Sequence, residues 1–287
     1  GSDRQRRGRH QLGRAAEGVV RRMLRWSAVA ALLAILGAGL FANWIAPHGY
    51  ADQDRESPNL SPSRQYPLGT DELGRDRFSR LLYGTRVSLL LAPAAAAISI
   101  AVAVALGGFT AYAGAGWARA SSLVTDLMLS LPTILILLTV RAMLPLNVSA
   151  LASIVITCVL IGALNYPPAA RVIGAGVDAL LKSDFILQAR ATGQSPGRIL
   201  IRQLMPGIRP VLIAQFWLLV PVFVMAEANL SLLGLGVSEP MPSWGNLLRE
   251  LENYSAIPER PWVLAPLGVL MVTVLCLYAI LPSGEPA

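Results

Sequence analysis

Residues 181–210 read LKSDFILQARATGQSPGRILIRQLMPGIRP and form a polar stretch between two apolar runs of the chain. Asp184 is the only acid in this stretch. Its cationic residues are Lys182, Arg190, Arg198, Arg202 and Arg209. Basic segments that separate apolar runs are typical of loops on the cytoplasmic side of a membrane protein. The charge pattern alone therefore predicts an inner loop.

Local signals in the same stretch predict two short helices joined by a turn. Ser183 suits an N-cap position, and Asp184 lies favourably in the first turn of the helix that follows. Gly193 suits the left-handed residue that ends this helix. Ser195-Pro196 is a typical start for a second helix, and Pro206 is expected to break the pattern again.

The composition predicts an all-α, polytopic membrane protein. Of the 287 residues, 54% are hydrophobic and 14% are charged, whereas soluble domains are nearer one quarter charged. Several apolar runs reach the roughly 20 residues that a helix needs to cross a bilayer. Cys158 and Cys276 lie inside such runs, so no disulfide framework is indicated. Six spans are expected, at about 26–46, 88–113, 120–144, 150–166, 211–230 and 262–281.

The distribution of basic residues predicts the orientation and the division of the chain. Residues 1–25 are rich in arginine and are expected to form a cytoplasmic tail near anionic lipid. Residues 26–282 would form one transmembrane domain, followed by a cytoplasmic end at 283–287. The net charge of +7 does not indicate a nucleic-acid partner, because the basic residues follow the positive-inside pattern. Both termini are therefore expected in the cytoplasm.

The segment 47–86 is expected to be an outer loop that contains an amphipathic helix. Its second half, with the start of the next span, reads PLGTDELGRDRFSRLLYGTRVSL at residues 67–89. Thr70 is a candidate N-cap, and pairs at i, i+4 are expected between Asp71 and Arg75 and between Asp76 and Arg80. The predicted helix begins at Thr70, lies near the outer membrane surface and leads into the second span.

A third informative stretch is EANLSLLGLGV at residues 227–237, followed by Pro240, Pro242 and the tripeptide SWG at 243–245. Glu227 is an acid well inside an apolar run, where an ionisable group usually faces the bundle interior, a partner or water. Glu227, with Asn229 beside it, is a candidate for lining a pathway. Pairing of Glu227 with a cation of a partner subunit is the alternative.

Together the three stretches resemble the second permease subunit of dipeptide, oligopeptide and nickel ABC importers, over roughly residues 26–282. The resemblance implies six transmembrane helices in the type I ABC importer permease fold. The family's coupling-loop motif has Glu-Ala-Ala, three residues, Gly, nine residues, Ile, one residue and Leu-Pro. Here Ala189, Gly193 and Pro206 match. The departures are Leu187 for Glu, Gln188 for the first Ala, Gln203 for Ile and Met205 for Leu.

The resemblance implies two sets of functional residues. Coupling to an ATPase would involve Phe185, Leu187, Gln188, Ala189, Arg190, Gly193 and Pro206. Contacts of the outer loop with a binding protein or partner permease would involve Gly69, Thr70, Asp71, Gly74, Arg75, Asp76, Ser79, Arg80, Gly84 and Arg86.

The resemblance also implies partners and a cellular location. The partners would be a second permease subunit in a heterodimer, two ATP-binding subunits, an extracytoplasmic solute-binding protein and membrane lipid. The location would be the bacterial plasma membrane. The sequence has no GxxxxGK[ST] loop, and His10 and His48 are too far apart to form a metal-binding pair on one helix. We therefore expect a non-catalytic subunit without a metal or cofactor, with ATP and Mg²⁺ held by its partners.

The cargo and the class of transporter have alternatives. Dipeptides or oligopeptides are the expected cargo, with a nickel chelate or haem as alternatives in the same role. A stand-alone channel or ion-coupled carrier is an alternative of a different class, and a membrane scaffold without transport is another. Ion coupling needs ionisable groups inside the membrane, and Glu227 is the prominent one.

Overall fold

The computed structural model describes the backbone of residues 2–108, 110–145, 148–253 and 257–281, and the side chains among them from residue 20 onward except 110–115. The expected cytoplasmic end at 283–287 lies outside the described residues. The helices and helical turns are α1 (Ser2–Leu40), α2 (Ala42–Ile45), α3 (Arg77–Ala103), η1 (Val104–Gly108), α4 (Thr110–Ser130), α5 (Thr133–Met143), α6 (Ala150–Leu164), α7 (Pro167–Leu181), α8 (Asp184–Ala191), α9 (Pro196–Ile199), η2 (Leu200–Leu204), α10 (Met205–Leu232), α11 (Trp244–Leu248), η3 (Arg249–Glu252), η5 (Pro261–Leu264) and α12 (Ala265–Ile280).

The architecture confirms an all-α polytopic membrane protein. Four helical segments of the described chain are long and apolar enough to cross a bilayer: Val20–Leu40, Arg77–Gly108, Pro196–Leu232 and Pro261–Ile280. Two bent pairs of helices add a span each when each pair is counted as one crossing, which gives the expected six. The segment expected as a tail at 1–25 is continuous with the first span, because α1 begins at Ser2.

The predicted third span at 120–144 is wrong as a straight helix. It is broken between Ser130 and Thr133, where Gly116–Ser130 and Thr133–Met143 meet at 95°. Pro132 causes the break, because proline lacks the N–H for a helical bond and disfavours helical backbone at the residue before it. The chain also bends where Pro167-Pro168 begin α7, with an angle of 47° between α6 and α7.

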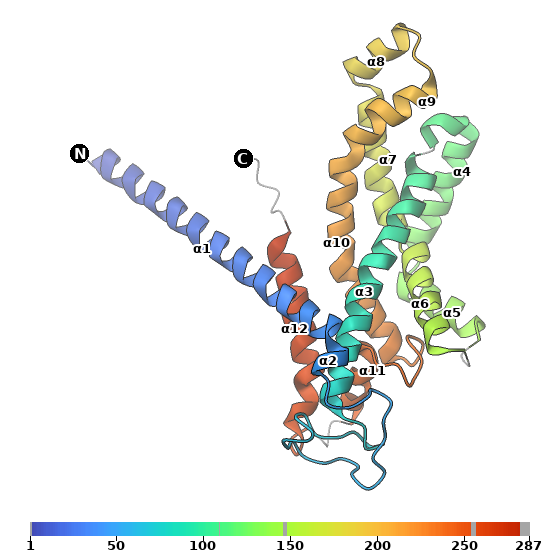
Figure 1. Cartoon of the computed structure of the whole chain (residues 1–287). Helices are drawn as coiled ribbons and strands as arrows, with labels where there is room; N and C mark the ends of the chain where they lie inside the picture. The colour runs from blue at the N-terminus through green and yellow to red at the C-terminus, as the bar shows by residue number, and fades with distance from the viewer. Residues whose placement is uncertain (1, 109, 146–147, 254–256, 282–287) are drawn as a thin grey trace.

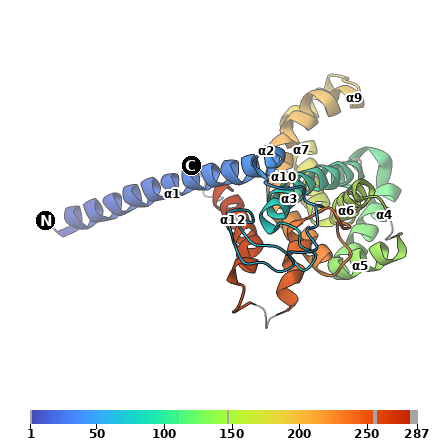
Figure 2. The same ribbon diagram turned by 60° about the horizontal axis from the view of Figure 1, so that its bottom comes forward.

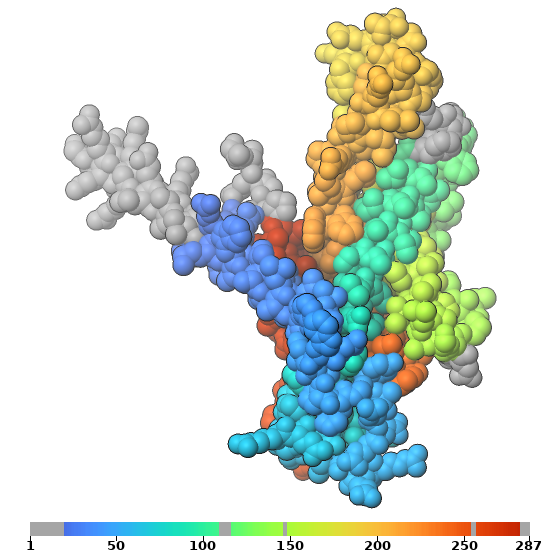
Figure 3. All heavy atoms as spheres, in the orientation of Figure 1, coloured from blue at the N-terminus to red at the C-terminus, as the bar shows by residue number. Residues whose placement is uncertain are grey.

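The helices place two loop regions at opposite ends of the molecule. Figure 1 shows α8 and α9 at one end and residues 46–76, here called the cap segment, at the other. Helices α3 and α10 run side by side between these ends (Figures 1 and 3). Helix α1 packs on α12 and α3 near the cap segment and extends away from the bundle towards its amino terminus (Figure 2).

The predicted amphipathic helix that begins at Thr70 is also wrong, because the first helix after the cap segment begins at Arg77. The Asp71 carboxylate accepts bonds from the backbone N–H groups of Leu73 and Arg75, both at 2.9 Å, which holds a tight turn. An aspartate that bonds nearby amides in this way competes with helix formation. Thr70 donates its hydroxyl to the carbonyl of Ser57 at 2.6 Å and caps no helix.

Asp76, which was expected to pair with Arg80, is instead the N-cap of α3. Its carboxylate accepts bonds from the backbone N–H groups of Phe78 at 3.2 Å and Ser79 at 3.1 Å. From this cap, α3 continues through Pro93 into the membrane span. The helix that the sequence placed on the membrane surface is thus the end of the span nearest the cap segment.

Pro206 does not break the chain, contrary to the prediction. Residues Pro196–Leu232 form one helical segment. It contains the π-turn η2, in which the N–H of Met205 bonds the carbonyl of Leu200, five residues earlier. This wider turn changes the bonding register immediately before Pro206, so the missing N–H of the proline does not interrupt the helix.

We expect Asp76→Ala to lower the thermal midpoint of the detergent-purified protein, followed by tryptophan fluorescence. Two backbone amides at the start of α3 lose their acceptor, and loss of an N-cap costs about 0.5–2 kcal/mol. Glu72→Ala, at an exposed acid of the same loop, is the matched control and should leave the midpoint unchanged. An equal midpoint for Asp76→Ala and wild type would contradict this helix start.

Candidate transport site and coupling loop

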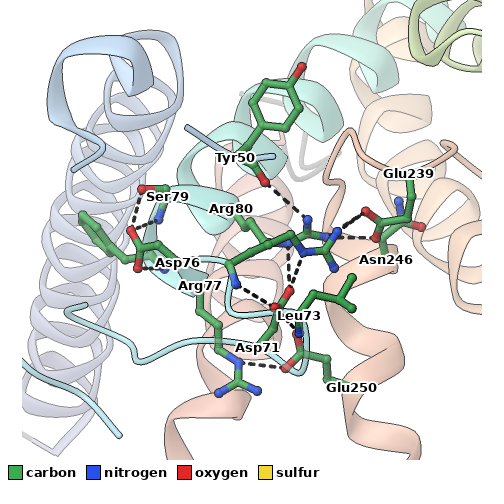
Figure 4. A network of polar contacts seen from close by, with 12 residues as sticks. Tyr50, Asp71, Leu73, Asp76, Arg77, Ser79, Arg80, Glu239, Asn246 and Glu250 are labelled. Carbon is green, nitrogen blue, oxygen red and sulfur yellow. Dashed lines mark hydrogen bonds and ion pairs between the residues drawn. The ribbon is translucent and has the colours of Figure 1, made fainter. Parts of the chain in front are cut away.

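Two arginines connect the start of α3 to the loop that follows α10. Arg75 donates to Asp71 at 2.7 Å and to Glu239 at 2.8 Å. Arg80 donates to both carboxylate oxygens of Glu239, at 2.9 and 3.2 Å (Figure 4). Arg80 is only 2% exposed, so its charge depends on these acids for compensation. The expected Asp71–Arg75 pair is confirmed, although it lies in a turn instead of a helix.

A second contact joins the same helix start to the segment before α12. Arg77 donates to Glu250 at 2.8 Å (Figure 4). Burial raises the pKa of Glu250, while the positive charge of Arg77 opposes this shift. Because Arg77 is itself 8% exposed, the pair is largely removed from water. The contacts of Arg75 and Arg80 with Glu239, and of Arg77 with Glu250, hold α3, the 233–243 loop and η3 together.

The cap segment requires glycine at two of its turns. Gly69 and Gly74 have φ angles of 69° and 73°. A Cβ atom at Gly69 would lie 2.1 Å from the carbonyl oxygen of Leu60, and one at Gly74 would lie 1.8 Å from that of Asp54. Both glycines are therefore needed for the fold of the cap segment.

Most of the outer-loop residues that were expected to contact other proteins instead contact other residues of this chain. The Ser79 hydroxyl is buried and donates to Asp76, and the N–H of His48 donates to Ser79. Gly84 is buried where α3 closely approaches Ser243 and Leu247. Arg86 differs from the rest of the set, because it lies beyond the network and lines a groove between α3 and α6.

Glu227 is enclosed, with no exposed surface, and its carboxylate binds two serines. Ser88 of α3 donates to it at 3.0 Å, and Ser231, one turn further along α10, donates at 2.7 Å. The N–H of Trp244 donates to the Ser88 hydroxyl at 3.1 Å, which adds α11 to the cluster. We call Glu227, Ser88, Ser231 and Trp244 the serine clamp. It joins α3, α10 and α11 and keeps Glu227 away from any pathway surface of this chain.

Asn229 lies on the opposite face of α10 and is exposed. Two residues along a helix correspond to a rotation of about 200°. Asn229 is thus available to line a pathway or to contact a partner, whereas Glu227 is not.

The turn after α8 has the predicted geometry. Gly193 has a φ of 75°, the N–H of Gln194 bonds the carbonyl of Ala189 at 3.1 Å, and that of Gly193 bonds the carbonyl of Arg190 at 3.0 Å. These two bonds define a Schellman motif. Ser183 and Ser195 occupy the N-cap positions of α8 and α9, as expected, but neither side chain bonds a helical amide.

Helix α8 has one buried and one exposed side. Ile186 is fully buried and Ala189 is 4% exposed, so Ala189, which was expected among the coupling residues, does not offer a docking surface in this chain. They face inward because a helix of eight residues must cover its apolar side against the rest of its own loop. The exposed residues expected to act in coupling are Phe185, Leu187, Gln188, Arg190, Gly193 and Pro206.

Sequence reasoning missed the acids that complete the network. Glu239 and Glu250 lie more than 150 residues after the arginines that they contact. Glu239 precedes Pro240 and Glu250 lies in a polar run, so each reads as an ordinary loop acid. The cluster Arg75, Arg77 and Arg80 is matched in number by the nearby acids Asp71, Glu72 and Asp76, so the local sequence does not indicate that distant acids are needed.

The fold and these two ends define a transport permease: a bundle of membrane-spanning helices with an ordered cap at one end and an exposed short helix at the other. Residues 85–282 match the family described as "Binding-protein-dependent transport system inner membrane component". The chain belongs to this family and is the permease subunit of an ABC importer.

Relatives with a named transport role are 31–33% identical to this chain over most of its length. A putative peptide permease protein of Brucella suis is 33% identical over 236 residues, which are 82% of this chain and 76% of the relative. The di/tripeptide transport system permease protein DppC of Pseudomonas aeruginosa is 32% identical, over 84% and 78% of the two chains. The glutathione transport system permease protein GsiD of Escherichia coli is 31% identical, over 88% and 81%.

We expect Glu227→Ala to lower the thermal midpoint strongly. It leaves the hydroxyls of Ser88 and Ser231 without their buried acceptor, and an unsatisfied buried group costs about 1–3 kcal/mol. Glu227→Gln, which retains one acceptor oxygen, should have an intermediate effect. Asn229→Ala, on the exposed face of the same helix, is the control. A stable Glu227→Ala protein with impaired transport would show that Glu227 belongs to the pathway.

Proposed function

We propose that this permease subunit imports peptides, with dipeptides or oligopeptides as the cargo class. The names of the relatives from Brucella suis and Pseudomonas aeruginosa support a peptide, and that of the Escherichia coli relative supports glutathione, which is itself a small peptide. The chain spans more than three quarters of each of these relatives. We therefore assign this chain the same role as these relatives and the same class of cargo, a small peptide.

The observation that carries the proposed mechanism is the position of α8. It stands at the end of the molecule opposite the cap segment (Figure 1) and presents Phe185, Leu187 and Arg190. A short helix with a fixed exit can act as a rigid lever when its exposed side docks on a soluble partner. Arg190 supplies a donor for a charge-assisted hydrogen bond with that partner. The partner proposed here is an ATP-binding subunit.

The assembly proposed here is a heterodimer of this chain with a second permease, two ATP-binding subunits and an extracytoplasmic solute-binding protein. This chain acts as a non-catalytic subunit, and its partners hold ATP and Mg²⁺. Leu187 stands where the related loops have Glu, so any charged contact of that Glu is lost on this side. The two permeases would then couple unequally to their ATPases.

The proposed orientation places both termini and α8 in the cytoplasm and the cap segment outside. The excess of arginine in residues 1–25 and in 181–210 supports it. In a background with Cys158 and Cys276 replaced by serine, an impermeant thiol reagent added to intact cells should label Ser63→Cys and not Gln194→Cys. Labelling of Gln194→Cys alone would require the inverse orientation.

We expect Gly193→Val to insert and assemble normally, while peptide uptake and cargo-stimulated ATP hydrolysis fall together. The φ of 75° is strained for a β-branched residue, although a Cβ atom there meets no other atom within 4 Å. The defect therefore comes from the turn that orients α8. Gly197→Val is the matched control, because a Cβ atom at Gly197 also meets no other atom within 4 Å, while the φ of Gly197 is not positive. Wild-type activity of assembled Gly193→Val would exclude α8 as the coupling element.

A further inference from the structure

Four arginines lie at the end of the cap segment and in the first three turns of α3, and one of them, Arg86, differs from the others. Arg75, Arg77 and Arg80 each have a carboxylate partner within 3 Å. Arg86 has a single hydrogen bond among the described residues, a long one of 3.4 Å from its Nη1 to the side-chain oxygen of Asn43. No acidic side chain of the described residues contacts the guanidinium of Arg86.

The side chain of Arg86 lines a groove of about 590 Å³ between α2, α3 and α6. Tyr50 and Tyr83 line it together with Arg86, and their ring centroids are 5.0 Å apart. Further along α3 and on α6 the lining is apolar and includes Leu90, Ile154 and Cys158. The groove thus has a cationic and aromatic part and an apolar part, and its volume suits a small ligand.

The position of Arg86 on α3 restricts what the groove can face. Arg86 lies nine residues after the start of α3, about 14 Å along the helix, and belongs to the half of the segment Arg77–Gly108 nearer the cap segment. A guanidinium on a membrane-spanning helix normally faces water, a pathway or an anion. An anion that also places apolar groups against the apolar lining satisfies both parts of the groove.

We propose that this groove is the entry site for cargo and that Arg86 binds the terminal carboxylate of the peptide. This inference rests on the peptide import proposed above and adds a recognition residue to it. The planar guanidinium can donate two parallel hydrogen bonds to a carboxylate. Tyr50 and Tyr83 flank the peptide backbone, and Leu90 and Ile154 contact apolar side chains of the cargo.

Cys158 provides a native reporter inside the groove, and Cys276, on α12 outside it, provides the internal control. The complete transporter, with its cognate partners, is reconstituted in vesicles together with binding protein loaded with a free-acid dipeptide. Alkylation of both cysteines by N-ethylmaleimide and uptake of the labelled dipeptide are measured for wild type, Arg86→Gln and Arg64→Gln. Arg64 is an exposed arginine of the cap segment and serves as the matched control for loss of charge.

In wild type and Arg64→Gln, we expect the cargo to slow alkylation of Cys158 several-fold and to leave Cys276 unchanged. In Arg86→Gln the protection should be lost and uptake should fall about tenfold or more, as expected for a lost hydrogen bond to a charged group. Because all variants receive the same loaded binding protein, its own selectivity cancels in the comparison.

Other results overturn the inference in distinct ways. Unchanged protection and uptake in Arg86→Gln would show that Arg86 does not bind cargo. Reduced uptake in Arg86→Gln without protection of Cys158 in wild type would assign Arg86 to lipid phosphate or to an acid of the second permease. In both cases peptide uptake by wild type stands. A wild-type transporter that takes up no peptide would instead reject the proposed function itself.

Discussion

The absence of hydrogen-bonding partners in hydrocarbon is the constraint on which this fold depends. Every backbone N–H and C=O within the bilayer must be satisfied by the protein, so the spans are helices and their interruptions need compensation. The chain contains prolines at positions 93, 132, 206 and 221 within or next to its spans. At Pro93 and Pro221 the helix continues, at Pro206 a π-turn precedes the proline, and at Pro132 the helix breaks and turns.

The same constraint applies to charged side chains, and the structure meets it by bonding buried charged groups to partners on other elements or one helical turn away. Arg80 and Glu227 are both almost completely buried, yet each is bonded: Arg80 to Glu239, and Glu227 to Ser88 and Ser231. Removal of one partner leaves an uncompensated buried group, which costs more than the intact contact contributes. These contacts therefore fix the position of α3 relative to α10 more than they raise overall stability.

Hydropathy was sufficient to predict the class of fold and the places of the long apolar helices, because an apolar run of about 20 residues has few alternatives to a membrane helix. Gly193 was likewise predictable, since a left-handed turn after a short helix favours glycine. The start of α3 was not, because Thr70 and Asp76 are both good N-caps locally. The contacts of Thr70 with Ser57 and Leu60, and the turn held by Asp71, select the second. The exposed side of α8 and the partners of the arginines depend on tertiary packing, which the sequence pattern does not contain.

A single helical segment connects the two ends of the molecule. Pro196–Leu232 begins beside α8, contains the π-turn η2 and ends in the serine clamp. The 233–243 loop and the start of α11 then contact α3, through Glu239 with Arg80, Ser243 near Gly84 and Trp244 with Ser88. In the coupling proposed above, a displacement of α8 by an ATP-binding subunit would reach the cap segment along α10 and through η2. Because a π-turn is wider and less regular than the α-helix around it, η2 is the point of this segment at which such a displacement would be absorbed most easily.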